Sequence, residues 1–513
     1  MTGGDGWSPR ARLRALARRI DAATPPHRDR AADALRALAI AGVIGGHWLV
    51  TALVAGRGQG PGTALADDSP LASMPYLAPV SWIFQTLAVF FLVGGYAAAR
   101  GYRGGYGPWL RRRLTRLARP VAVLAAVWIP VTAGLCLAGV SAGTIRTLLT
   151  LVIDPLWFLG VYAVLTAFTP LGVRLVRRLG LAAAAIPAAV VAAVDLVRFG
   201  LHGPGWIGWV NLPAGWLVPY LLGIAWALGP LAARRARRAP LLLLATGAAA
   251  TAALIVWARY PASMVGVNGG RISNLNPPTL AAVIFGVAQC GLALALRGPL
   301  TRWMRRPAAW AAVATVNLSA MTLFLWHQTA FITVCAAGLL AGRVPGLLTT
   351  PAGAAWIAGR IAWLPVFAAV LALLWLPLRG AEHGSRRRPR RPRRPSRTDP
   401  HRPRQMNPHR SRQMKVPSIW PWPYGRAVDA GSIAGAGAGA TAEAIAGSDA
   451  GAIAGRRQSR RSARTSARCL PWTCASWSSW VRQEKPSART VAPSPADRTA
   501  GSRAVSATAT ETS

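Results

Sequence analysis

The chain has 513 residues, of which 52% are hydrophobic and only 15% are charged, and its formal net charge is +43. The apolar residues gather in blocks of about 20, each long enough to cross the hydrocarbon core of a bilayer as a helix. This distribution excludes a soluble globular protein. The positive charge does not indicate a nucleic-acid partner, because before the C-terminal segment the arginines cluster in alternate loops between apolar blocks, as membrane topology requires.

The first 30 residues are basic and predict an amphipathic cytoplasmic segment. In "ARLRALARRI", Leu13, Leu16, Ala17 and Ile20 recur at helical spacing, with arginines around the rest of the turn. We expect this helix to lie flat on the anionic inner leaflet of the membrane. A disordered basic leader is the alternative.

Residues 31–379 predict an all-α membrane bundle of ten spanning helices, several of which begin at proline. Arginines crowd the N-terminal segment and the second, fourth, sixth and eighth loops. The positive-inside rule therefore places both termini in the cytoplasm of a multi-pass protein of the inner (plasma) membrane. The predicted spans are Leu35–Val54, Leu77–Ala99, Leu117–Leu137, Pro155–Val173, Leu179–Val197, Pro213–Leu231, Pro240–Ala258, Pro277–Leu296, Val313–Ala337 and Ala355–Leu378.

Residues 380–513 have a different composition, in which "RRRPRRPRRPSR" precedes an Ala/Gly-rich stretch and a Ser/Arg-rich end. No periodic apolar face is present to offset the entropy of ordering, so we predict a disordered, low-complexity tail. Its basic start suits anionic lipid, and a misplaced reading frame or stop codon would also explain the composition. Cys469 and Cys474 lack the two further ligands of a zinc site, so we expect no metal.

Two ionisable residues lie in the first predicted span, although such residues are costly in hydrocarbon. Arg36 and His47 are eleven residues apart. This spacing is about 1,100° of helical rotation, close to three turns, so the two side chains share a helix face about 16 Å apart along the axis. They cannot touch each other, but one elongated ligand can meet both. Asp33 lies one turn before Arg36 and is placed to pair with it.

His327 lies in the ninth predicted span at the same depth as His47 in the first, about 20 Å from the cytoplasmic end of each helix. We therefore expect the two imidazoles and the Arg36 guanidinium to line one polar cleft that opens to the cell interior. An imidazole suits the removal of a proton from a hydroxyl, because it exchanges protons near neutral pH. The alternatives are a structural histidine bonded to a neighbouring helix and a pair of haem ligands.

A cluster of arginines lies in "RGYRGGYGPWLRRRLTRLARP", residues 100–120. Arg112 and Arg116 follow helical spacing, and Arg113 precedes Arg116 by three residues. Guanidinium forks bind phosphates, and the start of the third span adds free backbone N–H groups. We expect a phosphate-bearing ligand here, although topology alone also explains the arginines.

These segments together resemble the acyltransferase-3 family of integral-membrane O-acyltransferases. "ADALRALAIAGVIGGHW" is similar to the first helix of the family, in which an arginine is followed after ten residues by a histidine, and Arg36 and His47 match this spacing. "MTLFLWHQTAFI" resembles the late helix with a second histidine, matched by His327. "FFLVGGYAAARGYR" with "RRRLTRLARP" resembles the second helix and the arginine-rich loop. "NLNPPTL" is similar to an actinobacterial branch of the family.

The resemblance implies transfer of an acyl group, often acetyl, from cytoplasmic acyl-CoA to a hydroxyl of a glycan, a lipid-linked saccharide or a natural product, without a tightly bound cofactor. We expect His47 to act as general base, with His327 and Arg36 as the other catalytic residues. The expected substrate-binding residues are Asp33, Arg103, Arg112, Arg113, Arg116 and Trp157. This chain departs from many relatives at Tyr162, where they carry a glutamate, so an acidic partner for a histidine is not carried over. A transporter or flippase of lipid-linked sugars is the alternative function.

Overall fold

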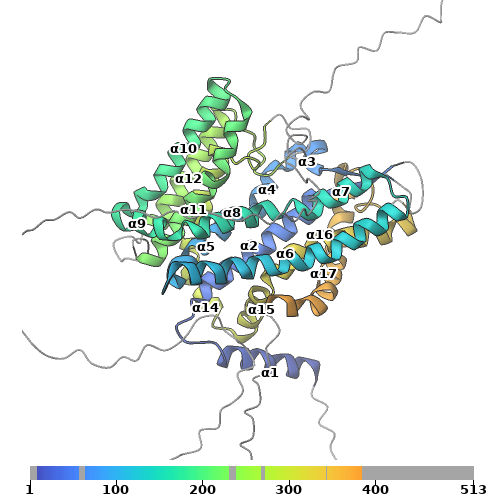
Figure 1. Cartoon of the computed structure of the whole chain (residues 1–513), viewed down its shortest axis with the longest axis horizontal. Coiled ribbons are helices and arrows are strands. Elements are labelled where there is room, and N and C mark those ends of the chain that lie inside the picture. The colour runs from blue at the N-terminus through green and yellow to red at the C-terminus, as the bar shows by residue number, and fades with distance from the viewer. Residues whose placement is uncertain are drawn as a thin grey trace, which may run out of the picture. The chain divides into compact units, whose positions relative to one another are not determined.

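The computed structural model describes residues 8–56, 64–229, 231, 238–266, 272–342 and 344–383, which are almost entirely helical (Figure 1). One short hairpin, of strands β1 (Ala52–Ala55) and β2 (Leu65–Asp68), interrupts the helices. The helices are α1 (Pro9–Ala22), α2 (Arg30–Val50), α3 (Pro70–Ser73), α4 (Ser81–Phe84), α5 (Leu87–Gly101), α6 (Tyr106–Leu137), α7 (Ala142–Ile153), α8 (Leu156–Ala167), α9 (Thr169–Leu179), α10 (Ala185–Asp195), α11 (Asn211–Leu228), α12 (Ala239–Val256), α13 (Leu280–Ala295), α14 (Arg297–Trp303), α15 (Pro307–Leu318), α16 (Ala320–Gly338) and α17 (Gly353–His383).

The prediction of an all-α membrane bundle is confirmed. The described residues contain nine helical segments long and apolar enough to span a bilayer, and the bent pair α13 and α14 makes up to ten. These segments follow the ten predicted spans in order. The pair α13 and α14 bends by 46°.

Three of the differences between the predicted spans and the observed helices are an early end or a break. The first helix ends at Val50, because Ala52–Ala55 pairs antiparallel with Leu65–Asp68, with Ala52 opposite Asp68. The fourth span begins earlier than expected, as α7, and breaks before α8 beside Pro155, which has no N–H to continue the helix. The ninth span breaks at Ser319, between α15 and α16.

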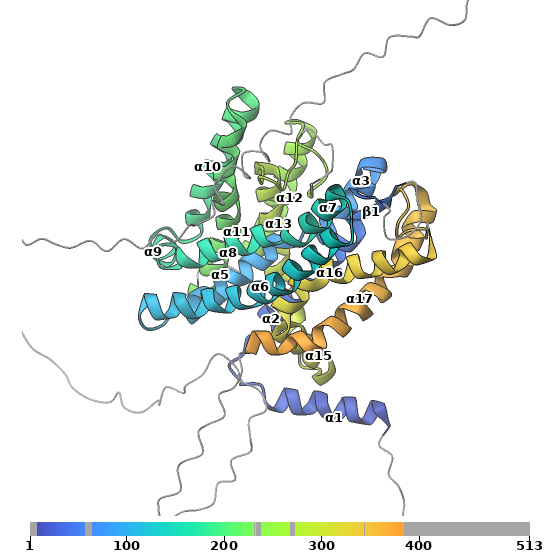
Figure 2. The same ribbon diagram turned by 45° about the vertical axis from the view of Figure 1, so that its right-hand side comes forward.

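The predicted N-terminal helix forms as α1, where the Ser8 hydroxyl accepts a hydrogen bond from the backbone N–H of Ala11. It packs against α15, burying Ala17 and Ile20, whereas Leu13 and Leu16 stay exposed. Figure 2 shows α1 at one end of the bundle, next to α15. Contact of α1 with a lipid leaflet stays a prediction, as does the side of the membrane on which this end lies.

The C-terminal boundary lies slightly beyond its predicted position, because α17 continues through His383 rather than ending before Gly380. Additional helical turns at a span end cost little where the backbone groups bond within the helix. The remainder of the predicted disordered tail, 384–513, falls outside the described residues.

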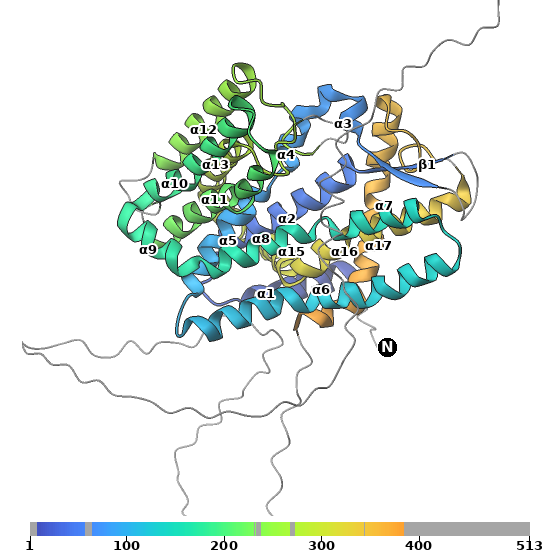
Figure 3. The ribbon, with the colours of Figure 1, turned by 45° about the horizontal axis from the view of Figure 1, so that its top comes forward.

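Two glycines allow α5 and α11 to pack with their backbones in contact. A Cβ added at Gly223 would lie 1.9 Å from the carbonyl oxygen of Leu92, and one added at Gly95 would lie 2.0 Å from that of Tyr220. Small residues permit this close approach in membrane bundles, where association depends on packing rather than on the hydrophobic effect. Helix α2 then packs against α5, α14, α15 and α16. Figure 3 shows α2 with α5, α15 and α16 around it.

We expect Gly223→Ala to lower the free energy of unfolding by more than the usual cost of overpacking, which is about 1–3 kcal/mol. The reason is that the added methyl group overlaps a carbonyl that cannot move freely. Thermal unfolding of the purified protein in detergent measures this effect. The matched control is Gly134→Ala on α6, where an added Cβ meets nothing within 4 Å. Equal losses of melting temperature in both variants would contradict the close α5–α11 contact.

Candidate active site

The contact between α2 and α16 brings the two predicted histidines together. The ring centroids of His47 and His327 lie 5.0 Å apart, with the ring planes at 67°. The expectation that both imidazoles occupy one depth is therefore confirmed. Direct edge contact between the rings leaves no space for a haem plane between them, so the haem alternative does not fit this geometry.

His327 is completely buried and its hydrogen bonding fixes the position of its proton. Its Nδ1 lies 2.5 Å from the carbonyl oxygen of Phe324, one turn earlier on α16. A carbonyl oxygen only accepts, so Nδ1 is the protonated nitrogen of the neutral ring. The other nitrogen, Nε2, is buried and has no hydrogen-bond partner among the described residues.

His47 keeps part of its surface accessible and is held from the side by an amide. The Nε2 of Gln328, a buried residue, lies 3.2 Å from Nδ1 of His47. The adjacent Trp48 donates its indole N–H to the carbonyl of His327 at 3.0 Å. The sequence analysis missed Gln328 and Trp48. The sequence does contain a signal for Gln328, because a side-chain amide inside a spanning helix must find a hydrogen-bond partner.

Arg36 is half-buried and carries an unpaired charge. Its guanidinium lies 6.0 Å from the ring centroid of Phe90, and it makes no hydrogen bond or ion pair within the part of the chain that the structure describes. A cation without a partner at this depth is available to an anionic or strongly polar ligand.

The predicted pairing of Asp33 with Arg36 is wrong. The Asp33 carboxylate pairs with Arg28 through two bonds, 2.5 Å from Nε and 2.7 Å from Nη2. The segment that leads into α2 places Arg28 beside the first turn of the helix, where it competes successfully for the carboxylate. Asp33 therefore supports the beginning of α2 and leaves Arg36 free.

A row of aromatic rings connects Arg36 with the histidine pair. The row contains one residue from each of three helices, Phe90 of α5, Phe158 of α8 and Phe324 of α16. The centroid distances are 4.8 Å between Phe90 and Phe158, 5.4 Å between Phe158 and Phe324, and 5.9 Å between Phe324 and His327. The row therefore begins at Arg36 and ends at His327, which contacts His47.

The arginines of the second loop differ in their exposure. Arg103, Arg112 and Arg116 are exposed, whereas Arg113 lies closer to α5, where its Nη2 donates to the carbonyl of Ala97 at 2.8 Å. The guanidinium of Arg113 also lies 5.0 Å from the centroid of Trp109.

The two remaining sequence positions of interest lie on α8, beside the aromatic row. Trp157 is half-buried, 6.4 Å from Trp216, and Tyr162 lies 5.5 Å from Phe90, measured between ring centroids. Tyr162 therefore adds another aromatic ring beside the row.

The sequence analysis also missed a carboxylate at the N-terminal end of α2. Asp29 caps the helix by accepting the N–H of Ala32, and its second oxygen accepts from the Tyr96 hydroxyl at 2.8 Å and from Arg297 at 3.2 Å. These bonds connect α2, α5 and α14 at the end of the bundle where Arg36 lies.

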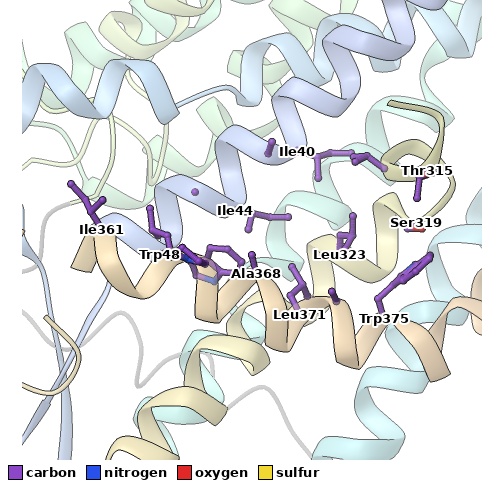
Figure 4. A pocket seen from close by; sticks show the side chains of 16 residues that line it. Ile40, Ile44, Trp48, Thr315, Ser319, Leu323, Ile361, Ala368, Leu371 and Trp375 are labelled. Carbon is purple, nitrogen blue, oxygen red and sulfur yellow. The ribbon is translucent and has the colours of Figure 1, made fainter. Parts of the chain in front are cut away.

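An apolar groove of about 730 Å³ runs on the neighbouring side of α2 (Figure 4). Side chains of α2, α15, α16 and α17 line it, including Ile44, Leu323 and Leu371. Trp48 forms part of its wall, so the groove and the histidine pair share one side chain.

The fold and the site define a class. The protein is a multi-pass helical membrane protein in which α2 carries a free guanidinium and an imidazole, and the imidazole contacts a second one on α16. The sequence model of the family described as an acyltransferase domain, the acyltransferase-3 family, matches residues 29–379. The match covers more than half of the chain, so this protein belongs to that family and is an acyltransferase. No curated protein and no solved structure matches the chain. Membership of an actinobacterial branch stays a prediction.

We expect Arg28→Met to lower the free energy of unfolding by about 1–3 kcal/mol, because it leaves the mostly buried Asp33 carboxylate without its cation. Arg36→Met should change it by less than about 0.5 kcal/mol, because no protein partner is lost. Thermal unfolding of both variants in the same detergent tests this contrast. A loss in Arg36→Met as large as that in Arg28→Met would make Arg36 a structural residue.

Proposed function

We propose that this protein is an inner-membrane O-acyltransferase with both termini in the cytoplasm. It moves an acyl group, with acetyl as the expected case, from acyl-CoA to a hydroxyl of a glycan, a lipid-linked saccharide or another small molecule. One observation carries the proposal: α2 carries a free guanidinium and an imidazole, and the imidazole contacts a second one on α16, inside a chain of the acyltransferase-3 family.

The spacing along α2 suits a long, narrow donor. Arg36 and His47 are separated by about 16 Å of helix axis, which matches a thioester arm extended from the cytoplasmic end toward the histidines. The exposed arginines Arg103, Arg112 and Arg116 are available for the phosphates at the other end of the donor, and Arg113 lies on the same helix as Arg112 and Arg116. The aromatic row beside this path excludes water, which limits hydrolysis of the thioester.

The chemistry needs one proton acceptor and no redox step. An imidazole takes the proton of the acceptor hydroxyl while the oxygen attacks the thioester carbonyl. The C–S bond then breaks, and the thiolate leaving group receives the proton. The partly exposed His47 supports contact of the pair with substrate.

A transporter or flippase of lipid-linked sugars would use the same residues without making or breaking a bond. The apolar groove beside Trp48 would suit the lipid part of such a cargo as well as that of a lipid-linked acceptor. Family membership favours transfer over translocation alone.

We expect membranes that contain the wild type to transfer label from acetyl-CoA to a glycan or small molecule, detected by mass spectrometry. His47→Ala should reduce this transfer by at least about 10²-fold, the smallest usual contribution both of a positioned acid or base and of a donor to the developing oxyanion. Arg36→Met should reduce it as well, mainly through KM, since the residue holds the donor.

The control variant is Gly134→Ala, which should retain transfer, because an added Cβ there meets nothing within 4 Å. All variants must reach the membrane in comparable amounts. Translocation of a sugar lipid without consumption of acyl-CoA would refute the proposal in favour of a transporter. Acyl transfer by His47→Ala at the wild-type rate would refute the catalytic role of the imidazole pair.

A further inference from the structure

We infer that the two histidines have different and complementary tasks: Nε2 of His327 accepts the proton of the acceptor, and Nε2–H of His47 donates a hydrogen bond to the carbonyl oxygen under attack. Gln328 is the positioning residue that imposes this division. The inference rests on the proposed function and assigns the chemistry of that site to particular atoms.

The evidence for His327 is its bond to the backbone. The contact of 2.5 Å between Nδ1 and the Phe324 carbonyl places the single ring proton on Nδ1. Nε2 then presents a lone pair, and no hydrogen-bond donor in the described chain occupies it. The lone pair of Nε2 can therefore accept the proton of a substrate hydroxyl that reaches this ring.

The evidence for His47 is the amide beside it. The NH₂ group of Gln328 donates toward Nδ1 at 3.2 Å, so Nδ1 is an acceptor and the ring proton lies on Nε2. Gln328 is only 2% exposed and cannot swing into solvent. Its Oε1 has no hydrogen-bond partner among the residues described, so no second bond favours the reversed amide.

Helical geometry explains why neighbouring residues of α16 can hold these two tasks. His327 and Gln328 are about 100° apart around the helix, so one supplies a ring against His47 and the other an amide against its edge. A neutral amide can donate to Nδ1, whereas a carboxylate only accepts and would force the proton onto Nδ1. Gln328 thus gives this chain, with Tyr162 in place of the family glutamate, a different means of orienting the imidazole.

The assigned atoms complete a balanced reaction. Nε2 of His327 takes the hydroxyl proton as the acceptor oxygen bonds to the thioester carbon, and the developing oxyanion accepts the hydrogen bond from Nε2–H of His47. When the C–S bond breaks, the thiolate takes the proton from His327. The products are an ester and a free thiol, and both rings return to their starting tautomers.

The first test reads the tautomers without any reaction. In ¹⁵N spectra of the full-length protein with labelled histidine in lipid nanodiscs, protonated and bare ring nitrogens are well separated, and His47→Gln identifies the His47 signals. We expect His47 to carry its proton on Nε2 in the wild type and on Nδ1 in Gln328→Glu. A wild-type proton on Nδ1 of His47, which would follow if the Gln328 amide were reversed, overturns the inference.

The second test compares substitutions that keep a donor with those that remove it. A glutamine side chain places an amide N–H near the position of Nε2 but cannot accept a proton as a base. We expect His47→Gln to transfer acyl groups at least tenfold faster than His47→Ala, and His327→Gln to be no faster than His327→Ala. Any other pattern among variants of equal melting temperature overturns the assignment.

Gln328 itself is tested by Gln328→Met, which keeps the shape of the side chain and removes the hydrogen bond. We expect kcat to fall by about 10–100-fold, as is typical when the partner of a functional histidine is lost, with KM unchanged. An unchanged kcat would overturn the positioning role. Absence of acyl transfer by the wild type would defeat the proposed function instead, and the spectra would still report the tautomers.

Discussion

The seam between α2 and α16 is the contact on which the site depends. Three interactions cross it: the indole N–H of Trp48 on the His327 carbonyl, the amide of Gln328 on His47, and the edge contact of the two rings. In hydrocarbon no water replaces a lost partner, and such directional bonds help to fix the relative rotation of two helices. Because the partners are some 280 residues apart in the chain, the seam forms only when the bundle is complete.

The opposite wall of the site depends on a different kind of contact. Gly95 and Gly223 bring the backbones of α5 and α11 together, and this contact sets the position of Phe90, the first ring of the aromatic row. The row continues through α8 to α16 and returns to the histidines. Close packing without polar groups therefore positions one wall, and directional hydrogen bonds position the other.

The sequence predicts the elements of this fold well because membrane insertion depends on local quantities. The length and polarity of each apolar block define a span, and the number of residues from its start defines a depth, which is why the contact of His47 with His327 could be anticipated. Contacts that form where loops fold back could not be anticipated in this way. The pairing of Asp33 with Arg28 and the hairpin that ends α2 depend on how loops fold back, and the bond of Gln328 depends on the rotation of α16 about its own axis.

An unpaired polar group is informative only together with its surroundings, as two arginines illustrate. Arg360 on α17 is completely buried and none of its guanidinium nitrogens has a hydrogen-bond partner in the described residues. It is nevertheless enclosed by the rings of Phe331, Trp356 and Phe367 at 5.1, 4.8 and 5.7 Å, whose faces attract the cation. Arg36 has one ring at 6.0 Å and keeps accessible surface. The protein satisfies the first charge with its own side chains and leaves the second for a ligand.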